Sequence, residues 1–532
     1  MKIIVKQLFT FLSAAILLCL TQTTVAQKVE QDTLIILLNR LTDPAANLPQ
    51  KEVNGIITNT THALGLQNIS DRDAAILLLS RAIAYSKFEN FENANKDFAA
   101  ALKHAKKESN KVLESITLQH LGTSLQQQGK TDAANAKLLE ALSIAKSAGN
   151  DTLMAEVLLQ IGSNYWSIAK FSKAMSAFSQ ATDLGKSSGN QNIIIRGYSN
   201  EAICSRDLGH YDDALSAIKS AIEKSRKSSI LWLPSLLNLK GSIFYKFGQQ
   251  DSAIACYHNG LSVVSQGNNQ ADLKAVLLEN LALCFKEKQQ FSRAQKLLDS
   301  SLAIRKVNED TLGLAKTYTQ LGNLYLQNAS YTNALESYLS ALELRQQLRN
   351  KAEVASSLTS IGLLYRNLGL NEKAISYFTQ ALEERLQSGS PVEIGEAYTH
   401  LGNAFYDVKK YEKALSSYEK ALAYRERAND NTLEARSLNS ISTANQMLGK
   451  NGAAERNFLK ALSLYQSNSD AKGLALVRNN LGNFYLAQDN LPKALNNFYL
   501  AAKTNHATGN KLAEGLCYRK IEEIYQIGRA HV

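Results

Sequence analysis

Residues 311–350 decide the fold, and they read TLGLAKTYTQLGNLYLQNASYTNALESYLSALELRQQLRN. Tyr318, Leu321, Gly322 and Tyr325 are three or four residues apart, so they share one face of a helix. A polar turn follows, and small and apolar residues then return with the same helical spacing. The stretch predicts two antiparallel helices joined by a short turn.

The same pattern recurs along the chain with a step of 40 residues, apart from one step of 39 and one of 41. A small residue opens each unit at Ala82, Gly122, Gly162, Ala202, Gly241, Ala282, Gly322, Gly362, Gly402, Ser442 and Gly482. An alanine follows twelve residues later in every unit, and another small residue follows nineteen residues later in every unit. Small side chains at fixed positions let neighbouring helices approach closely, so we expect stacked helical hairpins.

These residues carry a family resemblance. Tyr318, Leu321, Gly322 and Tyr325, followed by Ala334 and Tyr338, are similar to the tetratricopeptide signature, and residues 398–418 repeat it. The resemblance implies an all-α fold, a right-handed superhelical solenoid of antiparallel helix hairpins whose helices A line the concave face. The unit is longer than the usual repeat of about 34 residues and resembles the longer-helix variant of kinesin light chains.

The chain divides into four segments. Residues 1–26 have a basic start, an apolar core from Leu8 to Leu20 and small residues before Gln27, as in a secretory signal. Residues 27–70 are expected to form capping helices, and residues 71–526 the array of eleven complete repeats and the start of a twelfth. The alternative for the first segment is a buried first helix of the fold.

Residues 527–532, IGRAHV, resemble no repeat. They match the in-frame translation of a common sequencing-adapter sequence, so we interpret them as an artefact and the chain as a fragment. The alternative is a natural tail.

Composition narrows the function classes. The formal charge is +11, or +9 once Lys2 and Lys6 are removed with the signal, and the basic residues are dispersed along the helices. A solvated surface explains this charge, and we expect no nucleic-acid partner. Once Cys19 is removed with the signal, four cysteines are left, and they match no zinc pattern. Only Cys256 and Cys284, in neighbouring repeats, form a pair worth testing for a disulfide.

Catalysis is not expected from the visible chain. It contains no HExxH motif and no phosphate-binding GxxxxGK[ST] motif, and its eight histidines are scattered. We therefore predict no enzyme activity up to Gln526, no cofactor and no metal site. Enzyme activity stays open for a missing C-terminal part beyond Gln526.

A row of polar residues on helix A is the best candidate site. These residues stand two before or one after the small position, and they are His120, Gln160, Asn200, Asn280, Gln320, Asn323, His400, Asn403, Asn480 and Asn483. The resemblance places such positions in the groove, where amides can pair with the backbone of a bound peptide. The alternative is a merely solvated face.

Repeats four and five depart from the pattern. Glu201 and Lys240 occupy a usually apolar position in adjacent repeats, and residues 225–234 replace the usual turn. We expect an ion pair between the two side chains, which marks either a local contact site or neutral drift with mutual compensation.

The first functional hypothesis is a protein- or peptide-binding scaffold that forms the extracytoplasmic sensor segment of a truncated bacterial signalling protein, a histidine kinase or helix-turn-helix regulator. Its localisation would be exported and periplasmic, with membrane anchoring through the missing C-terminal part. The second hypothesis is a stand-alone exported scaffold for assembly of an envelope complex. A small-molecule ligand stays open.

Overall fold

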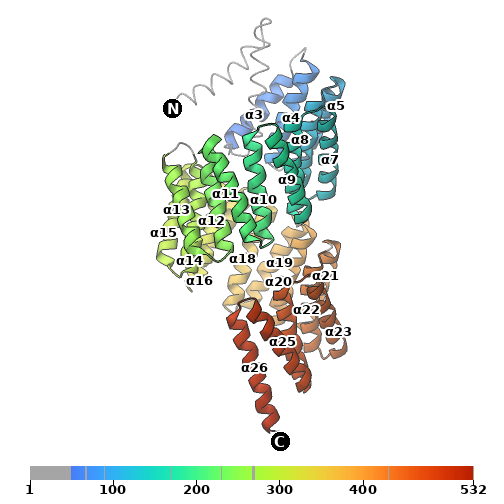
Figure 1. The fold of residues 1–532 in the computed structure, drawn as a ribbon. Helices are drawn as coiled ribbons and strands as arrows, with labels where there is room; N and C mark the ends of the chain where they lie inside the picture. Colours follow the sequence, from blue (N-terminus) through green and yellow to red (C-terminus); the bar gives the residue numbers. More distant parts are fainter. Residues whose placement is uncertain are drawn as a thin grey trace. The chain divides into compact units, whose positions relative to one another are not determined.

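The computed structural model describes residues 50–65, 69–88, 90–168, 170–228, 230–266, 270–428 and 430–530. These residues form α-helices, one short 3-10 helix and turns, without a strand (Figure 1). The predicted signal segment and residues 27–49 lie outside the described part. None of the described helices combines the length and the apolar character needed to cross a bilayer.

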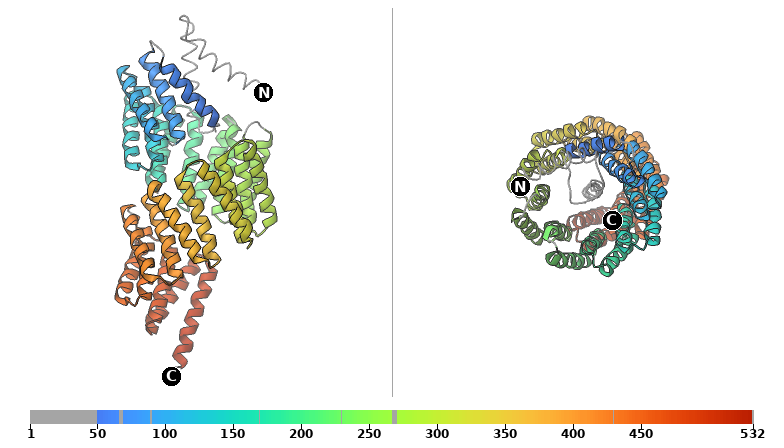
Figure 2. Two further views of the ribbon diagram at one scale, coloured as in Figure 1. Left: turned by 180° about the vertical axis from the view of Figure 1, so that it is seen from behind. Right: turned by 90° about the horizontal axis from the view of Figure 1, so that it is seen from above.

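The chain separates into two compact units, residues 1–288 and 289–532, and each is a stack of hairpins (Figures 1 and 2). In unit 1 the helices A are α4 (Asp71–Lys87), α6 (Lys111–Gln127), α8 (Asp151–Ser167), α10 (Gln191–Asp207), α12 (Leu233–Lys246) and α14 (Ala271–Glu287). The helices B are α5 (Phe91–Lys107), α7 (Thr131–Ser147), α9 (Phe171–Ser187), α11 (Tyr211–Ser228) and α13 (Gln250–Gln266). From α6 to α12, each helix A packs on the helix B that follows it and on the helix B that precedes it.

Unit 2 repeats this plan. Its helices B are α15 (Phe291–Val307), α17 (Tyr331–Gln347), α19 (Asn371–Ser388), α21 (Tyr411–Ala428), α23 (Asn451–Ser467) and α25 (Leu491–Ala507). Its helices A are α16 (Thr311–Gln327), α18 (Lys351–Asn367), α20 (Pro391–Asp407), α22 (Asn431–Met447), α24 (Ala471–Leu486) and α26 (Lys511–Ala530). The prediction of an all-α solenoid of antiparallel helix hairpins is confirmed.

Close packing inside each hairpin explains the small residue on helix A. A Cβ atom on Gly322 would lie 2.4 Å from the ring of Tyr338, and one on Gly162 would lie 2.4 Å from the ring of Phe178. The large residue sixteen positions on therefore lies directly against the glycine backbone. The alanine twelve positions after the small residue is fully buried in all eleven units, from Ala94 to Ala494.

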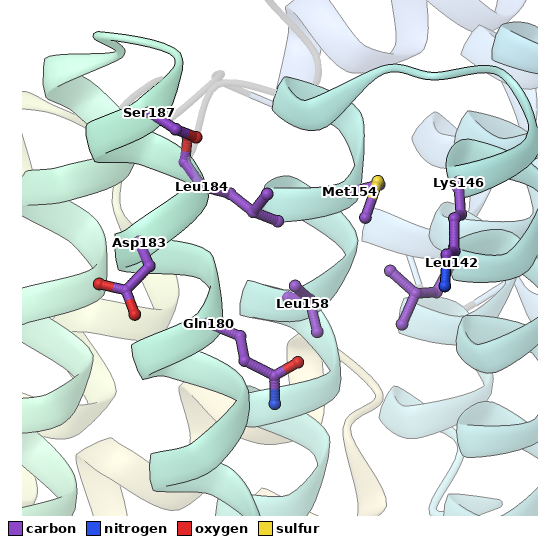
Figure 3. Close-up of a pocket in the computed structure, with 8 residues that line it drawn as sticks. All are labelled: Leu142, Lys146, Met154, Leu158, Gln180, Asp183, Leu184 and Ser187. Atoms are coloured by element: carbon purple, nitrogen blue, oxygen red, sulfur yellow. The ribbon is translucent and has the colours of Figure 1, made fainter.

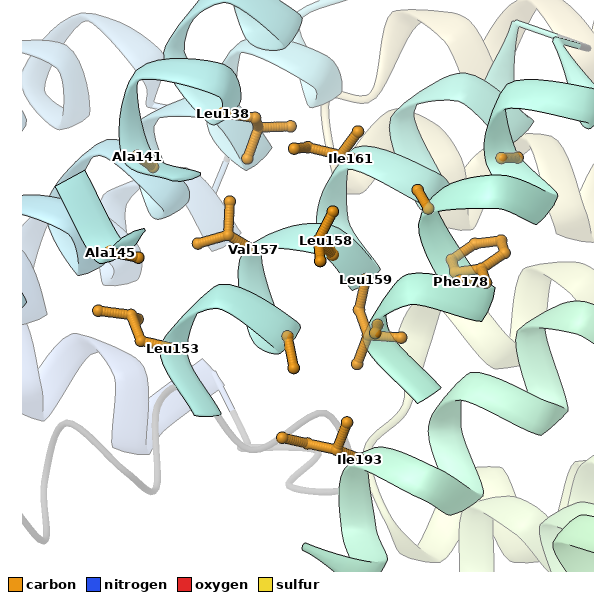
Figure 4. Packing of buried hydrophobic residues seen from close by; sticks show 14 of the residues in the cluster. Leu138, Ala141, Ala145, Leu153, Val157, Leu158, Leu159, Ile161, Phe178 and Ile193 are labelled. Carbon is orange, nitrogen blue, oxygen red and sulfur yellow. The ribbon is translucent and has the colours of Figure 1, made fainter. Parts of the chain in front are cut away.

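The core is continuous between hairpins. In the cluster drawn in Figure 4, Leu138 and Ala141 of α7, Val157 and Ile161 of α8 and Phe178 of α9 form one apolar layer. Close-packed layers of this kind give stacked repeats their stability, since each repeat buries the apolar face of the next.

Capping residues fix where each helix A begins. The side chain before the helix accepts a hydrogen bond from the backbone N–H three residues on at Ser70, Asn110, Asn150, Asn190, Asp310, Asn350, Ser390, Asp430 and Asp470. Such a cap stabilises a helix by about 1 kcal/mol. The asparagines between repeats are thus N-caps of helix A and do not take the left-handed position that ends helix B. Glycine takes the left-handed position in some turns, as at Gly149, and ordinary residues such as Glu309 take it in others.

Two segments of unit 1 depart from the repeat pattern. At its start, α3 (Gln50–Leu64) packs on α4 and adds Val53 and Ile56 to the first apolar cluster. Further along, α11 is followed by a 3-10 turn, Ile230–Trp232, and Pro234 lies in the first turn of α12. The cap asparagine is missing there, so this link differs from the other turns between repeats.

Candidate functional site

All ten predicted site residues lie on helices A. The side chains of Asn323 and Asn483 are exposed, and the other eight residues are half-buried. Within unit 1, neighbouring helices A touch one another from α4 to α14, and in unit 2 the pairs α18 with α20 and α22 with α24 do so. The helices A of each unit therefore form a layer, and the site residues of that unit lie along it.

Two of the asparagines are engaged inside their own hairpin. The Tyr338 hydroxyl donates a hydrogen bond to Asn323 Oδ1 at 2.6 Å, and the Tyr418 hydroxyl donates to Asn403 Oδ1 at 2.8 Å. Burial raises the pKa of Tyr338 to about 12, so the hydroxyl stays protonated and remains a donor. These two amides satisfy buried hydroxyls, which is a structural role that the sequence pattern alone did not reveal.

Two more asparagines join neighbouring helices A. Asn280 Nδ2 of α14 donates to Asn238 Oδ1 of α12 at 2.7 Å, and Asn480 Nδ2 of α24 donates to Asn439 Oδ1 of α22 at 3.0 Å. These bonds fix the register between adjacent repeats and occupy part of the hydrogen-bonding capacity of each amide.

Burial sets the charge of the two histidines. Burial lowers the pKa of His120 to about 4, and it also lowers the pKa of His400. The ring of His400 stacks on Phe378 with 5.5 Å between ring centroids. Both side chains are therefore neutral at pH 7 and can offer hydrogen bonds without charge.

Three of the candidates keep their amides unengaged. Gln160 of α8, Asn200 of α10 and Asn483 of α24 have no side-chain hydrogen bond within the described part of the chain. They are the site residues best able to bind an external group. Gln320, on α16, is half-buried and is not one of these three.

A set of ion pairs between helices A was missed by the sequence analysis. Arg196 Nη1 of α10 donates to both carboxylate oxygens of Glu156 of α8 at 2.7 Å, and Arg366 of α18 pairs with Asp407 of α20. Trp166 Nε1 of α8 also donates to Asp207 of α10 at 2.9 Å. The partners stand 40 or 41 residues apart, so a search for opposite charges one repeat apart would have found the ion pairs.

The predicted ion pair between Glu201 and Lys240 is wrong. Glu201 instead accepts a hydrogen bond from Thr182 Oγ1 at 2.9 Å, and the Lys240 ammonium lies over the Phe244 ring, 5.7 Å from its centroid. Burial raises the pKa of Glu201. Each side chain finds a partner in its own surroundings, which removes the need for a pair between the repeats.

The remaining reactive groups are few. Cys204, Cys256, Cys284 and Cys517 are all free and buried, so no disulfide joins Cys256 to Cys284. Within the described residues, no group of three or more histidine, cysteine or acidic side chains is arranged to hold a metal ion.

Comparison with protein families decides what these hairpins are. The family described as "Tetratricopeptide repeat" matches residues 313–384 and 393–467. The chain is a tetratricopeptide-type repeat protein. A second family, "Anaphase-promoting complex subunit 5", matches residues 65–128 and 161–231. No curated protein matches the chain.

Three solved structures are similar to parts of this chain. The crystal structure of the apo form of RapI has 16% identity and a TM-score of 0.44, covering 67% of this chain and 99% of that chain. BtubC (BKLC) from P. vanneervenii has 20% identity and a TM-score of 0.34, covering 45% and 92%. A Rap protein complexed with competence and sporulation factor has 14% identity and a TM-score of 0.38, covering 62% and 97%.

Proposed function

We propose that this tetratricopeptide-type scaffold binds a protein or an extended peptide on its layer of helices A. The observation that carries the proposal is the set of unengaged amides on that layer, Gln160, Asn200 and Asn483. An amide offers both a donor and an acceptor, the two groups that an extended peptide backbone needs. Asparagine is also a mediocre helix former, and a purely solvated face could use lysine or glutamate instead.

The structure sharpens the choice of variants. Replacing Asn323 or Asn403 by alanine would leave a buried tyrosine hydroxyl without its acceptor, so a loss of binding could come from a disturbed hairpin. Gln160, Asn200 and Asn483 carry no such internal bond, and their removal tests recognition alone.

The experiment compares two triple variants in a pull-down of partners. The first is Gln160→Ala, Asn200→Ala, Asn483→Ala. The matched control, Ser143→Ala, Ser179→Ala, Ser463→Ala, changes exposed residues on helices B. We expect the first variant to lose partner recovery and the control to keep it. Equal recovery by the first variant and wild type would remove these residues from the site.

We further propose that the scaffold is the sensor segment of an exported bacterial signalling protein, with a histidine kinase or helix-turn-helix regulator as its output. The support is the basic, apolar and small-residue order of residues 1–26, which is typical of export, together with the resemblance of long-repeat arrays to sensor regions. The second candidate is a stand-alone exported scaffold for envelope assembly, which the same export pattern favours.

Reading the gene beyond the codon for Gln526 separates the two. A membrane helix with kinase or DNA-binding motifs agrees with the sensor, whereas a stop soon after the twelfth hairpin agrees with the stand-alone scaffold. N-terminal sequencing of the protein made in a bacterial host tests export, and we expect the mature chain to begin at Gln27.

A further inference from the structure

A cavity of about 510 Å³ opens between two helices B of unit 1, away from the amides described above. Its lining residues, which we call the α8 groove, are Leu142, Lys146, Met154, Leu158, Gln180, Asp183, Leu184 and Ser187. Figure 3 shows Leu142 and Lys146 on α7, Leu184 on the opposite wall formed by α9, and Met154 and Leu158 of α8 between them. The floor is apolar and the rim is polar, as in many binding sites.

A glutamate occupies the equivalent place in three other repeats, whereas most repeats carry an aliphatic residue there, such as Ile194, Leu314 and Leu474. The position of Met154, eight residues before the small residue of helix A, is held by Glu114, Glu434 and Glu514. Their side chains are only 16%, 18% and 19% exposed. In each case a basic side chain from an adjacent helix B reaches the carboxylate, at 3.6 Å for Lys106, 2.8 Å for Lys460 and 3.1 Å for His506.

The α8 groove lacks this carboxylate. Met154 stands at this position, and Lys146 stands at the helix position that Lys106 and His506 hold in their repeats. Lys146 is exposed and makes no ion pair within the described part of the chain. The acid on the other wall, Asp183, already pairs with Lys186 at 2.9 Å. The groove thus presents an apolar floor and one exposed cation that has no ion-pair partner within the described residues.

We propose that the α8 groove docks a partner-protein segment that carries a large apolar side chain next to an aspartate or glutamate. The apolar side chain packs on Leu142, Met154, Leu158 and Leu184. The carboxylate takes, toward Lys146, the place that Glu114 takes toward Lys106. This surface uses α7, α9 and the part of α8 between them and includes none of the amides of the proposed site, so it goes beyond the proposed function and gives the scaffold a second contact with a partner.

The test uses the whole chain and three fluorescein-labelled eleven-residue peptides in anisotropy titrations. One has a central phenylalanine flanked by glutamates, one has the same phenylalanine flanked by lysines, and one has serine between glutamates. We expect the glutamate–phenylalanine peptide to bind about fivefold tighter than the lysine peptide, a preference that high salt reduces, because the ion pair lies on an exposed rim. We expect it to bind more than about tenfold tighter than the serine peptide.

Met154→Glu supplies the missing carboxylate from within the chain. Three repeats tolerate glutamate at this position, so the variant should fold, and peptide affinity should fall by about tenfold or more. Leu314→Glu makes the same change at the equivalent position of α16 and should leave affinity unchanged. Lys146→Glu should reverse the preference toward the lysine peptide.

Three results would overturn the proposal. The first is that Met154→Glu binds the glutamate–phenylalanine peptide as tightly as the wild type does. The second is an affinity that does not depend on the central phenylalanine, and the third is that none of the peptides binds. Sedimentation of wild type and Met154→Glu identifies the occupant. Self-association that only the wild type shows would mean that a second copy of the chain fills the groove, which also contradicts a separate partner.

Discussion

The two units differ in which helix carries the large side chain where one hairpin packs on the next. At the α7–α8 and α9–α10 junctions of unit 1, helix B offers a small residue and the following helix A offers an aliphatic one, in the pairs Ala145 with Leu153 and Gly185 with Ile193. A Cβ atom on Gly185 would lie 2.8 Å from Ile193 Cγ2, so nothing larger fits there.

In unit 2 the sizes are exchanged. Tyr465 of α23 lies against Gly473 of α24, where a Cβ atom would come within 2.2 Å of the tyrosine ring. Two arginines at the same helix B position pair instead with an acid on the next helix A. Arg345 lies 2.9 Å from Glu353, and Arg385 lies 2.7 Å from Glu393. The tyrosine–glycine pair therefore keeps the combined volume of the alanine–leucine pair, whereas the arginine–glutamate pairs replace dispersion contacts by ion pairs.

Arg425 is the exception in this series. Its side chain is 1% exposed, it donates to Ser437 Oγ at 2.7 Å, and its Nε has no hydrogen-bond partner among the described residues. Leu433 stands where the other repeats have Glu353 and Glu393. Burial lowers the pKa of Arg425, because the charged guanidinium is desolvated and the carboxylates of Glu396 and Asp430 oppose this effect only in part.

Overpacking the exchanged pair should have the largest effect. Gly473→Leu places a side chain into the Tyr465 ring and should lower the free energy of unfolding of unit 2 by about 3 kcal/mol. The double variant Tyr465→Ala, Gly473→Leu recreates the unit 1 arrangement and should recover most of that loss. Urea denaturation of the four members of this cycle measures the coupling. Additive effects would contradict the exchange of sizes.

Removing one arginine should lower the free energy of unfolding by less than Gly473→Leu does. Arg345→Ala loses the pair with Glu353 and the hydrogen bond to Ser357 at 2.6 Å. We expect a loss of about 2 kcal/mol, below the value for a fully buried pair, because the Glu353 side chain is 32% exposed. Glu343→Ala, an exposed change on the same helix, is the control and should cost little. A loss as small as that of the control would show that the arginine only fills space.

Supplying the missing acid to Arg425 should stabilise the chain. Leu433→Glu should add about 1 kcal/mol at pH 7, since the new carboxylate faces an unpaired cation. The folded-state pKa of that carboxyl would lie below its unfolded value of about 4.3, so the gain should disappear as the pH falls below this range. Thermal unfolding at pH 7 and pH 3 measures both values. An equal gain at both pH values would exclude the ion pair as its cause.

The smallest effect at pH 7 is expected at His120. Burial lowers its pKa to about 4, below the value of about 6.5 for an exposed histidine. Between about pH 6.5 and 4 the unfolded chain therefore binds a proton that the folded chain does not bind. The free energy of unfolding falls as the pH drops through this range. His120→Gln should remove this part of the pH dependence and change little at pH 7. An unchanged slope between pH 6.5 and 4 would contradict the burial of this ring.

The sequence predicted the features that every repeat shares. The glycine of helix A and the alanine of helix B recur at fixed positions, so they can be recognised even when the residues that pack against them are unknown. The hairpins and their order therefore followed from Gly322, Ala334 and their equivalents. The contacts between repeats were harder to predict, because Ala145 with Leu153 and Tyr465 with Gly473 conserve a sum of volumes that no single position displays.

The candidate site was predicted in position but only partly in chemistry. The row of helix A residues lies on one layer in each unit, yet the amides of Asn323 and Asn403 serve tyrosines of their own hairpins. Tyrosine replaces phenylalanine at the facing position in those two repeats, and that substitution was the signal. The α8 groove could not be predicted, since its shape depends on the spacing of α7 and α9 around Met154.

Amide hydrogen exchange of the full chain tests the central claim, that the layer of helices A binds a partner, most directly. Peptides would be selected from a random display library against the Met154→Glu chain, in which the α8 groove is closed, and exchange compared with and without a saturating peptide. The proposed function predicts slower exchange along consecutive helices A, including α8 and α10 in unit 1 or α24 in unit 2. Protection confined to helices B would contradict it.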